Sequence, residues 1–286
     1  MSPLRKQMED DLVVRGMSPR TLESYTGAVA ALAKYYGRSP DGISAQEVQR
    51  YLLYLIQEKQ LAWSSCNIAL SGLKFFYRVT LKRPQAQFEL PTPRQPQKLP
   101  QILAPEEVVR IIELTDNPKH RALLMTTYAA GLRLSEVCHL KVSNIDSARM
   151  TIHVEQGKGA QDRYTPLSPR LLTELRRYWT LHRPKRWLFP STRHPDIAIL
   201  PKTVQRIFQR AKARARITKD CGIHGLRHAF ATHLLEAGVD VPTIQHMMGH
   251  GHISSTLRYF HLARKHLGQV PSPLDILPRP EPKQRS

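Results

Sequence analysis

The sequence predicts a mainly α-helical fold: an N-terminal helical bundle followed by an α-rich domain with a small antiparallel β-sheet. Apolar residues recur at helical spacing throughout residues 1–83. Five prolines within residues 84–100 prevent a helix from continuing and predict an extended linker between two domains. Residues 101–270 are mostly helical in pattern, but residues 150–154 alternate like a strand and residues 163–167 are typical of the returning strand.

Polar capping residues mark the helices of the first domain. Ser18 caps a helix whose first turn contains Pro19. Ser44, with Glu47 three residues later, forms a capping box for the next helix. Ser64–Ser65 precedes a third helix. We expect a bundle of about four helices, in which the aromatic residues fill the core rather than stack on nucleic-acid bases.

The second domain also begins with helices. Residues 104–107 start one helix, and residues 120–130 form a second. Helices resume at Ser168, after the predicted hairpin, and continue almost to the end of the domain. Residues 271–286 form a proline-rich tail for which we expect little regular structure.

Composition and charge narrow the class of protein. The 286 residues include 43 Lys and Arg against 23 Asp and Glu, which gives a formal net charge of +20. Three cysteines without CxxC spacing argue against a disulfide framework. No apolar run approaches the ~18 residues that span a membrane, so we expect a cytoplasmic protein. The charge favours nucleic acid as the partner, while an anionic membrane surface and a solvated basic exterior stay open.

Residues that could cleave a phosphodiester gather in the second domain. Without a metal, this reaction needs an activated hydroxyl nucleophile, two donors that clamp the phosphate oxygens, and an acid for the leaving oxygen. Arginine suits the clamp, because its planar fork binds phosphate through two hydrogen bonds and keeps its charge. The candidates are Arg133 and Arg227 for the clamp, Lys158 for the acid, His224 and His250 as titratable partners, and Tyr259 as the nucleophile.

The spacing of these candidates fits the chemistry. Ionising a tyrosine such as Tyr259 at pH 7 costs roughly 4 kcal/mol, so a base and two cations must offset much of that cost. His224 and Arg227 lie three residues apart at a predicted helix start and therefore share one face. The N-terminus of that helix adds partial positive charge that favours a bound phosphate.

Five short motifs contain these residues in a fixed order. They are AGLRLSE at 130–136, GKG at 157–159, HGLRH at 224–228, GH at 249–250 and TLRY at 256–259. Together they resemble the tyrosine recombinase (phage integrase) family, most of all its Xer-like site-specific recombinases and the integrases of mobile elements. The resemblance covers nearly the whole chain, and the joint order of the motifs is far more specific than any one of them.

The resemblance implies a role for each phosphate-binding residue. It implies that Arg133 and Arg227 hold the scissile phosphate and that Lys158 protonates the leaving 5′ oxygen. It also implies that Glu136, one turn after Arg133, supports the site. The helical bundle would then be a SAM-like domain that binds the core DNA site.

For the nucleophile, the resemblance implies that Tyr259 forms a 3′-phosphotyrosyl bond, with His224 as its acid/base partner and His250 as a further hydrogen-bonding group. A partner strand then attacks this bond, so the reaction uses no metal, no ATP and no other cofactor. Four protomers, identical or of two kinds, would act on two double-stranded DNA sites through a Holliday junction. The location implied is the bacterial cytoplasm, at the nucleoid.

Three other functions compete with this hypothesis. A type IB topoisomerase shares the phosphate chemistry but reseals the same strand, and a DNA-binding regulator would not cleave at all. A zinc hydrolase is suggested by two histidine pairs with ligand-like spacing, His224 with His228 and His246 with His250. The sequence has no HExxH motif and no paired cysteines, so we expect no metal.

A strongly basic helix is expected at residues 202–219, which contain seven basic residues and no acidic one. Arg206, Arg210 and Arg214 line one stripe of this helix, and we expect that stripe to contact DNA. A merely solvated face is the alternative. The residues expected to face the core are Val204, Ile207, Phe208 and Ala211.

Overall fold

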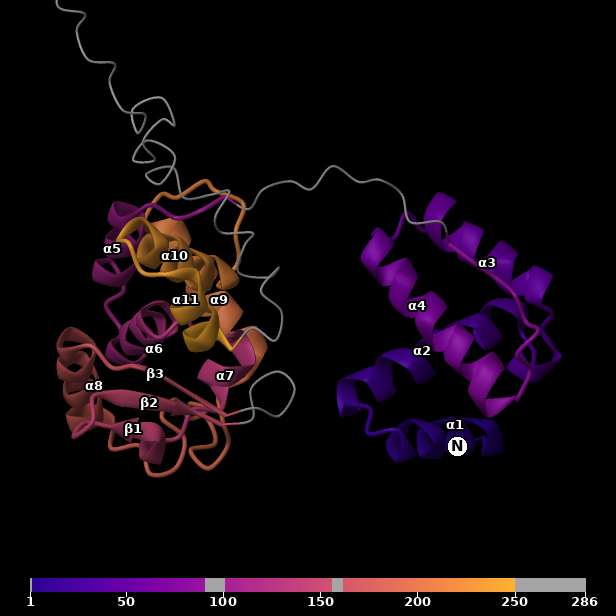
Figure 1. Ribbon diagram of the computed structural model, residues 1–286, viewed down its shortest axis with the longest axis horizontal. Helices are drawn as coiled ribbons and strands as arrows, with labels where there is room; N and C mark the ends of the chain where they lie inside the picture. The colour runs from indigo at the N-terminus through magenta and orange to yellow at the C-terminus, as the bar shows by residue number, and fades with distance from the viewer. Residues whose placement is uncertain (1, 91–100, 156–161, 250–286) are drawn as a thin grey trace, which may run out of the picture. The chain divides into compact units, whose positions relative to one another are not determined.

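The computed structural model describes residues 2–90, 101–155 and 162–249, and the chain divides into two compact units, residues 1–96 and 97–286 (Figure 1). Each unit has its own hydrophobic core. The described part is mainly helical with one small antiparallel sheet, which confirms the predicted fold class. No helix within these ranges is long and apolar enough to cross a membrane.

The first unit contains four α-helices among its described residues, as the sequence predicted. The Ser18 side chain accepts a hydrogen bond from the backbone N–H of Thr21 at the start of α2. Ser44 and Glu47 form the predicted capping box at the start of α3. The helices are α1 (Pro3–Val14), α2 (Pro19–Tyr36), α3 (Ala45–Gln57) and α4 (Trp63–Phe75), with a 3₁₀ turn at Pro40–Gly42 and a π-helical turn at Phe76–Thr80.

The third helix begins three residues earlier than the sequence predicted. Helix α4 begins at Trp63, so Ser64–Ser65 lies within its first turn instead of before it. The preceding residue, Ala62, has no side-chain acceptor that could cap the helix. No side-chain cap therefore marks the start of this helix, which packs against α2.

Aromatic residues fill much of the first core. Tyr77 is buried, and its hydroxyl donates to the carbonyl oxygens of Pro40 at 2.8 Å and Ile43 at 2.9 Å. Tyr51 is buried as well, whereas Tyr35 is 45% exposed. The expectation of a core role is thus confirmed for the first two tyrosines and wrong for Tyr35.

The second unit contains seven α-helices and a three-stranded sheet among its described residues. The strands are antiparallel in the order β1-β2-β3, and the sequence did not predict the two-residue β1. The elements are α5 (Pro105–Glu113), α6 (Pro118–Ala129), α7 (Leu134–Cys138), a 3₁₀ turn (Val142–Asn144), β1 (Ile145–Asp146), β2 (Thr151–Val154), β3 (Arg163–Pro166), α8 (Pro169–His182), α9 (Pro201–Arg214), α10 (His224–Glu236) and α11 (Val241–Met248).

The register of the β2–β3 pair turns one charged side chain inward. Val154 pairs with Arg163, and Ile152 pairs with Thr165. All four of these residues are buried, while Tyr164 between them is 57% exposed. Because side chains alternate between the two faces of a strand, Arg163 points to the same buried face as Thr165. Helix α11 packs against β3 and also against α10, so it connects the sheet with the helix that begins at His224.

Helix α9 is shorter than the sequence predicted. It ends at Arg214, not at Lys219, and Arg216 adopts a left-handed conformation with φ of 53° that an α-helix does not allow. The apolar face expected for this helix is confirmed. Its buried residues are Val204, Ile207, Phe208 and Ala211.

Candidate active site

The structure brings four of the seven predicted site residues together at one place. Arg133 directly precedes α7 and Glu136 lies within that helix, while His224 and Arg227 lie in the first turn of α10. The remaining three, Lys158, His250 and Tyr259, lie outside the described residues.

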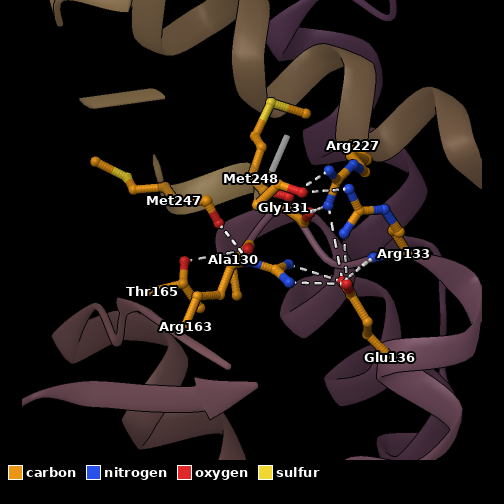
Figure 2. A network of polar contacts seen from close by, with 10 residues as sticks. Ala130, Gly131, Arg133, Glu136, Arg163, Thr165, Arg227, Met247 and Met248 are labelled. Carbon is orange, nitrogen blue, oxygen red and sulfur yellow. Dashed lines mark hydrogen bonds and ion pairs between the residues drawn. The ribbon is translucent and has the colours of Figure 1, made fainter. Parts of the chain in front are cut away.

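The carboxylate of Glu136 is the centre of this arrangement (Figure 2). Its Oε1 accepts from Nη1 of Arg133 at 2.7 Å and from Nη1 of Arg163 at 2.8 Å. Its Oε2 accepts from Nη2 of Arg163 at 2.8 Å and from the backbone N–H of Arg133 at 2.7 Å. Nη1 of Arg227 lies 3.7 Å from the same oxygen. Three guanidinium groups thus surround one buried carboxylate, and we call these four residues the arginine cluster.

The same three arginines hold the end of α11. The carbonyl oxygens of residues 247–249 accept, in order, from Nε of Arg163 at 2.7 Å, Nη2 of Arg227 at 2.6 Å and Nη2 of Arg133 at 2.7 Å. The last carbonyls of a helix have no partner within the helix, and its C-terminus carries partial negative charge. Cations at this position therefore satisfy both the hydrogen bonds and the dipole.

The charges in the arginine cluster fix the ionisation of Glu136. Burial by itself would raise the pKa of this carboxyl. The hydrogen bonds and charge of Arg163, with the hydrogen bonds from Arg133, outweigh burial and lower the pKa to about 2. Three arginines and one carboxylate leave a net charge of +2, which complements a phosphodiester.

Gly131 supplies another acceptor for Arg227. Its carbonyl oxygen accepts from Nη1 of Arg227 at 2.5 Å, and the arginine side chain is fully buried. Gly131 has φ of +58°, and a Cβ there would lie 2.4 Å from the ring of Phe230. Only glycine fits this turn, which explains the glycine two residues before Arg133 in the AGLRLSE motif.

His224 is held as a neutral imidazole beside the cluster. Its ring contacts that of His228, with centroids 4.6 Å apart. Desolvation lowers the pKa of His224, and the charges of Arg227 and Arg133 lower it further. The imidazole is therefore unprotonated at neutral pH and can accept a proton.

Sequence reasoning missed Arg163. It placed this residue in a strand but gave it no role, because a charged side chain in a strand usually faces solvent. The signal was the alternation itself: Arg163 shares a strand face with Thr165, whereas Tyr164 faces the other way. An arginine at an inward strand position needs a buried anion, and Glu136 is that anion.

The expected DNA-contact residues lie on α9, a helix that packs against α7. Arg206 and Arg210 are exposed. Arg214 is exposed too, and it forms an ion pair with Asp116. Two other basic residues of this segment make contacts within the protein. Lys212 Nζ donates to the carbonyl oxygen of Lys219 at 2.8 Å, and Lys219 Nζ forms an ion pair with Glu107 at 2.6 Å.

The described residues contain no group of three or more His, Cys, Asp and Glu side chains placed to bind a metal ion. The acidic residue of the site, Glu136, has its oxygens occupied by arginines.

Comparison with known proteins covers both units. Residues 101–266 match the phage integrase family, and residues 4–87 match the N-terminal SAM-like domain of phage integrases. An integrase/recombinase of Sinorhizobium fredii is 46% identical over 99% of this chain and 92% of its own length. The tyrosine recombinase XerA of Pyrococcus horikoshii is 32% identical over 94% of this chain and 92% of its own. Among solved structures, a lambda integrase tetramer bound to a Holliday junction shares the fold, with a TM-score of 0.71, 20% identity, and coverage of 90% and 76% of the two chains.

Proposed function

Because this chain belongs to the phage integrase family and is a tyrosine-type site-specific recombinase, we propose that Arg133 and Arg227 of its arginine cluster hold the scissile phosphate of the target DNA. The observation that carries this proposal is the convergence of Arg133, Arg163 and Arg227 on Glu136, with a net positive charge. A side chain that must stabilise a growing negative charge works best when its orientation is fixed beforehand.

Arg133 is the arginine most accessible to a substrate. Its side chain is 18% exposed, against 1% for Arg227. Glu136 and the carbonyl of Gly249 take two of its five N–H donors through the contacts described above. The other donors suit the non-bridging oxygens of a phosphate. In this proposal Arg227 supplies the second cation from the buried side.

The chemical step proceeds by attack of the Tyr259 hydroxyl on phosphorus. The bond from phosphorus to the 5′ oxygen breaks, a 3′-phosphotyrosyl bond forms, and Lys158 protonates the leaving 5′ oxygen. Neutral His224 takes the proton from the tyrosine, and His250 donates a hydrogen bond to the phosphate. The 5′ hydroxyl of a partner strand then attacks the phosphotyrosine, so one ester replaces another and neither ATP nor metal is consumed.

Each segment of the chain has a place in this scheme. Residues 1–83 bind the core DNA site, residues 84–100 link the domains, residues 101–270 carry the reaction, and residues 271–286 form a tail. The match of the first unit to a SAM-like integrase domain supports the first of these roles. Flanking duplex is held by α9, through Arg206, Arg210 and Arg214.

The partners follow from the reaction. Strand exchange needs two duplexes, so we propose that four protomers, of one or two kinds, assemble on two DNA sites. The lambda integrase tetramer on a Holliday junction, whose fold this chain shares, supports this stoichiometry. The proposed location is the cytoplasm of a bacterium, where the nucleoid is accessible.

The test is covalent capture of DNA. Sheared genomic DNA of the strain that encodes the chain is incubated with the protein, denatured, and the fragments bound to protein are sequenced. A nicked duplex is then built on the recovered site. The parent should form a covalent adduct on it, and Tyr259→Phe should not. Equal adducts from both proteins would contradict the choice of nucleophile, and no adduct from the parent would favour a regulator that does not cleave.

A second assay separates recombination from topoisomerase activity. A synthetic Holliday junction carrying the recovered site should be converted by the parent into two recombinant duplexes. Relaxation of a supercoiled plasmid without any joint between two duplexes would instead support a type IB topoisomerase. Dialysis against a chelator should leave the adduct yield unchanged, and a loss restored by zinc would overturn the mechanism.

A further inference from the structure

Arg163 is a buried arginine of the cluster that no step of the proposed reaction uses. It lies on β3 and is only 5% exposed. Nη1 and Nη2 of its guanidinium bind the two oxygens of Glu136, each at 2.8 Å, and its Nε donates to the carbonyl of Met247 at 2.7 Å (Figure 2). All three nitrogens therefore have a partner within the protein.

This geometry excludes Arg163 from binding the phosphate itself. The edge of the guanidinium that recognises a phosphate through two hydrogen bonds is filled by Glu136. A phosphate at that edge would displace the carboxylate and leave it buried without its bidentate partner. Such uncompensated burial of a charge is strongly unfavourable. The role of Arg163 must lie in what it holds.

Arg163 connects two helices that both contact Arg133. Through Glu136 it binds α7, and through Met247 it binds the end of α11. Arg133 itself donates to Glu136 at 2.7 Å and to the carbonyl of Gly249 at 2.7 Å. The hydrogen bonds thus form a closed ring that runs from β3 to α7, through Arg133 to α11, and back to β3.

We propose that Arg163 is a positioning residue of the recombination reaction, which holds Glu136 and the end of α11 in fixed relation and so orients Arg133 toward the scissile phosphate. The inference rests on the proposed role of Arg133 in phosphate binding. It adds a residue of β3 to a site whose other described members come from helices α7 and α10 and from the residue before α7.

The close approach of the Arg163 side chain to Gly249 supports this assignment independently of the hydrogen bonds. Gly249 has φ of +60°, and a Cβ there would lie 2.9 Å from Cδ and 3.2 Å from Nε of Arg163. A side chain at position 249 would therefore be strained by the backbone conformation and would meet the stem of Arg163. A lysine at position 163 would keep the charge but could not bind Glu136 and Met247 at once through a fixed fork.

The test measures the single-turnover rate of adduct formation at saturating nicked DNA, built on the site recovered from covalent capture. Arg163→Met removes the charge and the fork, and Arg163→Lys removes the fork alone. We expect R163M to slow adduct formation about 100-fold or more, since small displacements of catalytic groups cost that much. The Kd for DNA should stay within about threefold, because the phosphate contact matters most in the transition state. R163K should give an intermediate rate.

The matched control is Arg121→Met. Arg121 lies on α6 of the same unit and forms an ion pair with a buried carboxylate, that of Glu174, at 3.5 Å. Its removal therefore costs packing and charge without touching the arginine cluster. All rates are measured at a temperature at which circular dichroism shows every variant to be folded. R121M should react at the rate of the parent, within about threefold.

Coupling to Glu136 separates a positioning role from general stability. If Arg163 acts through Glu136, the double variant R163M/E136Q should be no slower than the slower of its two single variants. The effects of R121M and E136Q should instead multiply.

Three results would overturn the inference: an R163M rate within about threefold of the parent, independent effects of R163M and E136Q, or an equal loss in R121M. If R163M does not fold, R163K decides in its place, and a parental rate in R163K would refute the requirement for the fork. If the parent forms no adduct with any DNA, the proposed function fails and this inference fails with it. If the parent forms the adduct and R163M matches it, only the inference fails.

Discussion

Replacing Glu136 with glutamine should destabilise the second unit by an amount that depends on pH. Burial raises the pKa of this carboxyl, but Arg163 and Arg133 lower it by more, so that it falls from 4.5 to about 2. A carboxyl whose folded pKa lies below its unfolded pKa stabilises the fold above the unfolded value, and this stabilisation disappears as pH falls toward the folded value. The shift corresponds to about 3 kcal/mol of unfolding free energy at pH 7.

The variant removes that contribution and leaves three arginines around an uncharged amide. Breaking a buried ion pair costs about 3–5 kcal/mol, which agrees with the size of the pKa shift. At pH 3.5 this carboxyl is protonated in the unfolded chain but still ionised in the folded parent, so unfolding takes up a proton and the carboxylate stabilises the fold less than at pH 7. The difference in unfolding free energy between parent and E136Q should therefore narrow by more than about 1 kcal/mol between pH 7 and pH 3.5.

The assay is urea unfolding followed by tryptophan fluorescence. The chain has three tryptophans, and Trp63→Phe leaves Trp179 and Trp187, both in the second unit. In this background the fluorescence reports only the unit that contains the cluster. The control is Glu113→Gln, which changes an exposed carboxylate at the end of α5. A difference between parent and E136Q that is the same at pH 7 and pH 3.5 would refute the electrostatic reasoning, as would an equal loss in E113Q.

Three further outcomes are expected. The rate of adduct formation should fall in acid with an apparent pKa below 6.5, because desolvation and two arginines lower the pKa of His224; a midpoint above 6.5 in a pH–rate profile would contradict the neutral imidazole. Gly131→Ala should lower the unfolding free energy by about 1–3 kcal/mol, since φ is +58° and its Cβ would clash with a phenylalanine ring, and thermal unfolding would detect the loss. Arg206→Ala with Arg210→Ala should reduce the slope of log affinity against log salt by about 1.8 in DNA titrations, if each arginine contacts one phosphate; an unchanged slope would place DNA elsewhere.

Local signals predicted the parts of the fold that depend on neighbouring residues. The capping box of Ser44 and Glu47 and the buried stripe of α9 need only a few residues of sequence to recognise, and both are confirmed. The end of α9 was wrong because Arg216 adopts a left-handed conformation. Nothing in a basic, helix-forming stretch signals that turn, which is followed by the buried Ile217.

In the site, too, some residues could be predicted from the sequence and others only from the tertiary structure. The family resemblance assigned Arg133, Glu136 and Arg227 to one site, and in the structure both arginines lie next to Glu136. The central partner of Glu136, Arg163, lies 27 residues away on another element, and no periodicity relates the two. Such a pair is visible only once the strand register is known, since a shift of one residue would have turned Arg163 to solvent.

The anchoring of α11 also limits the distance that the proposed nucleophile can travel. Residues 247–249 are tied to three arginines, so the chain leaves the cluster from a fixed origin at Gly249. Tyr259 is ten residues farther along the sequence. Ten residues span at most roughly 35 Å when fully extended. If Tyr259 is the nucleophile, the phosphate that it attacks lies no farther from its own arginine cluster than this span plus the length of one tyrosine side chain, whichever protomer's arginines bind the phosphate.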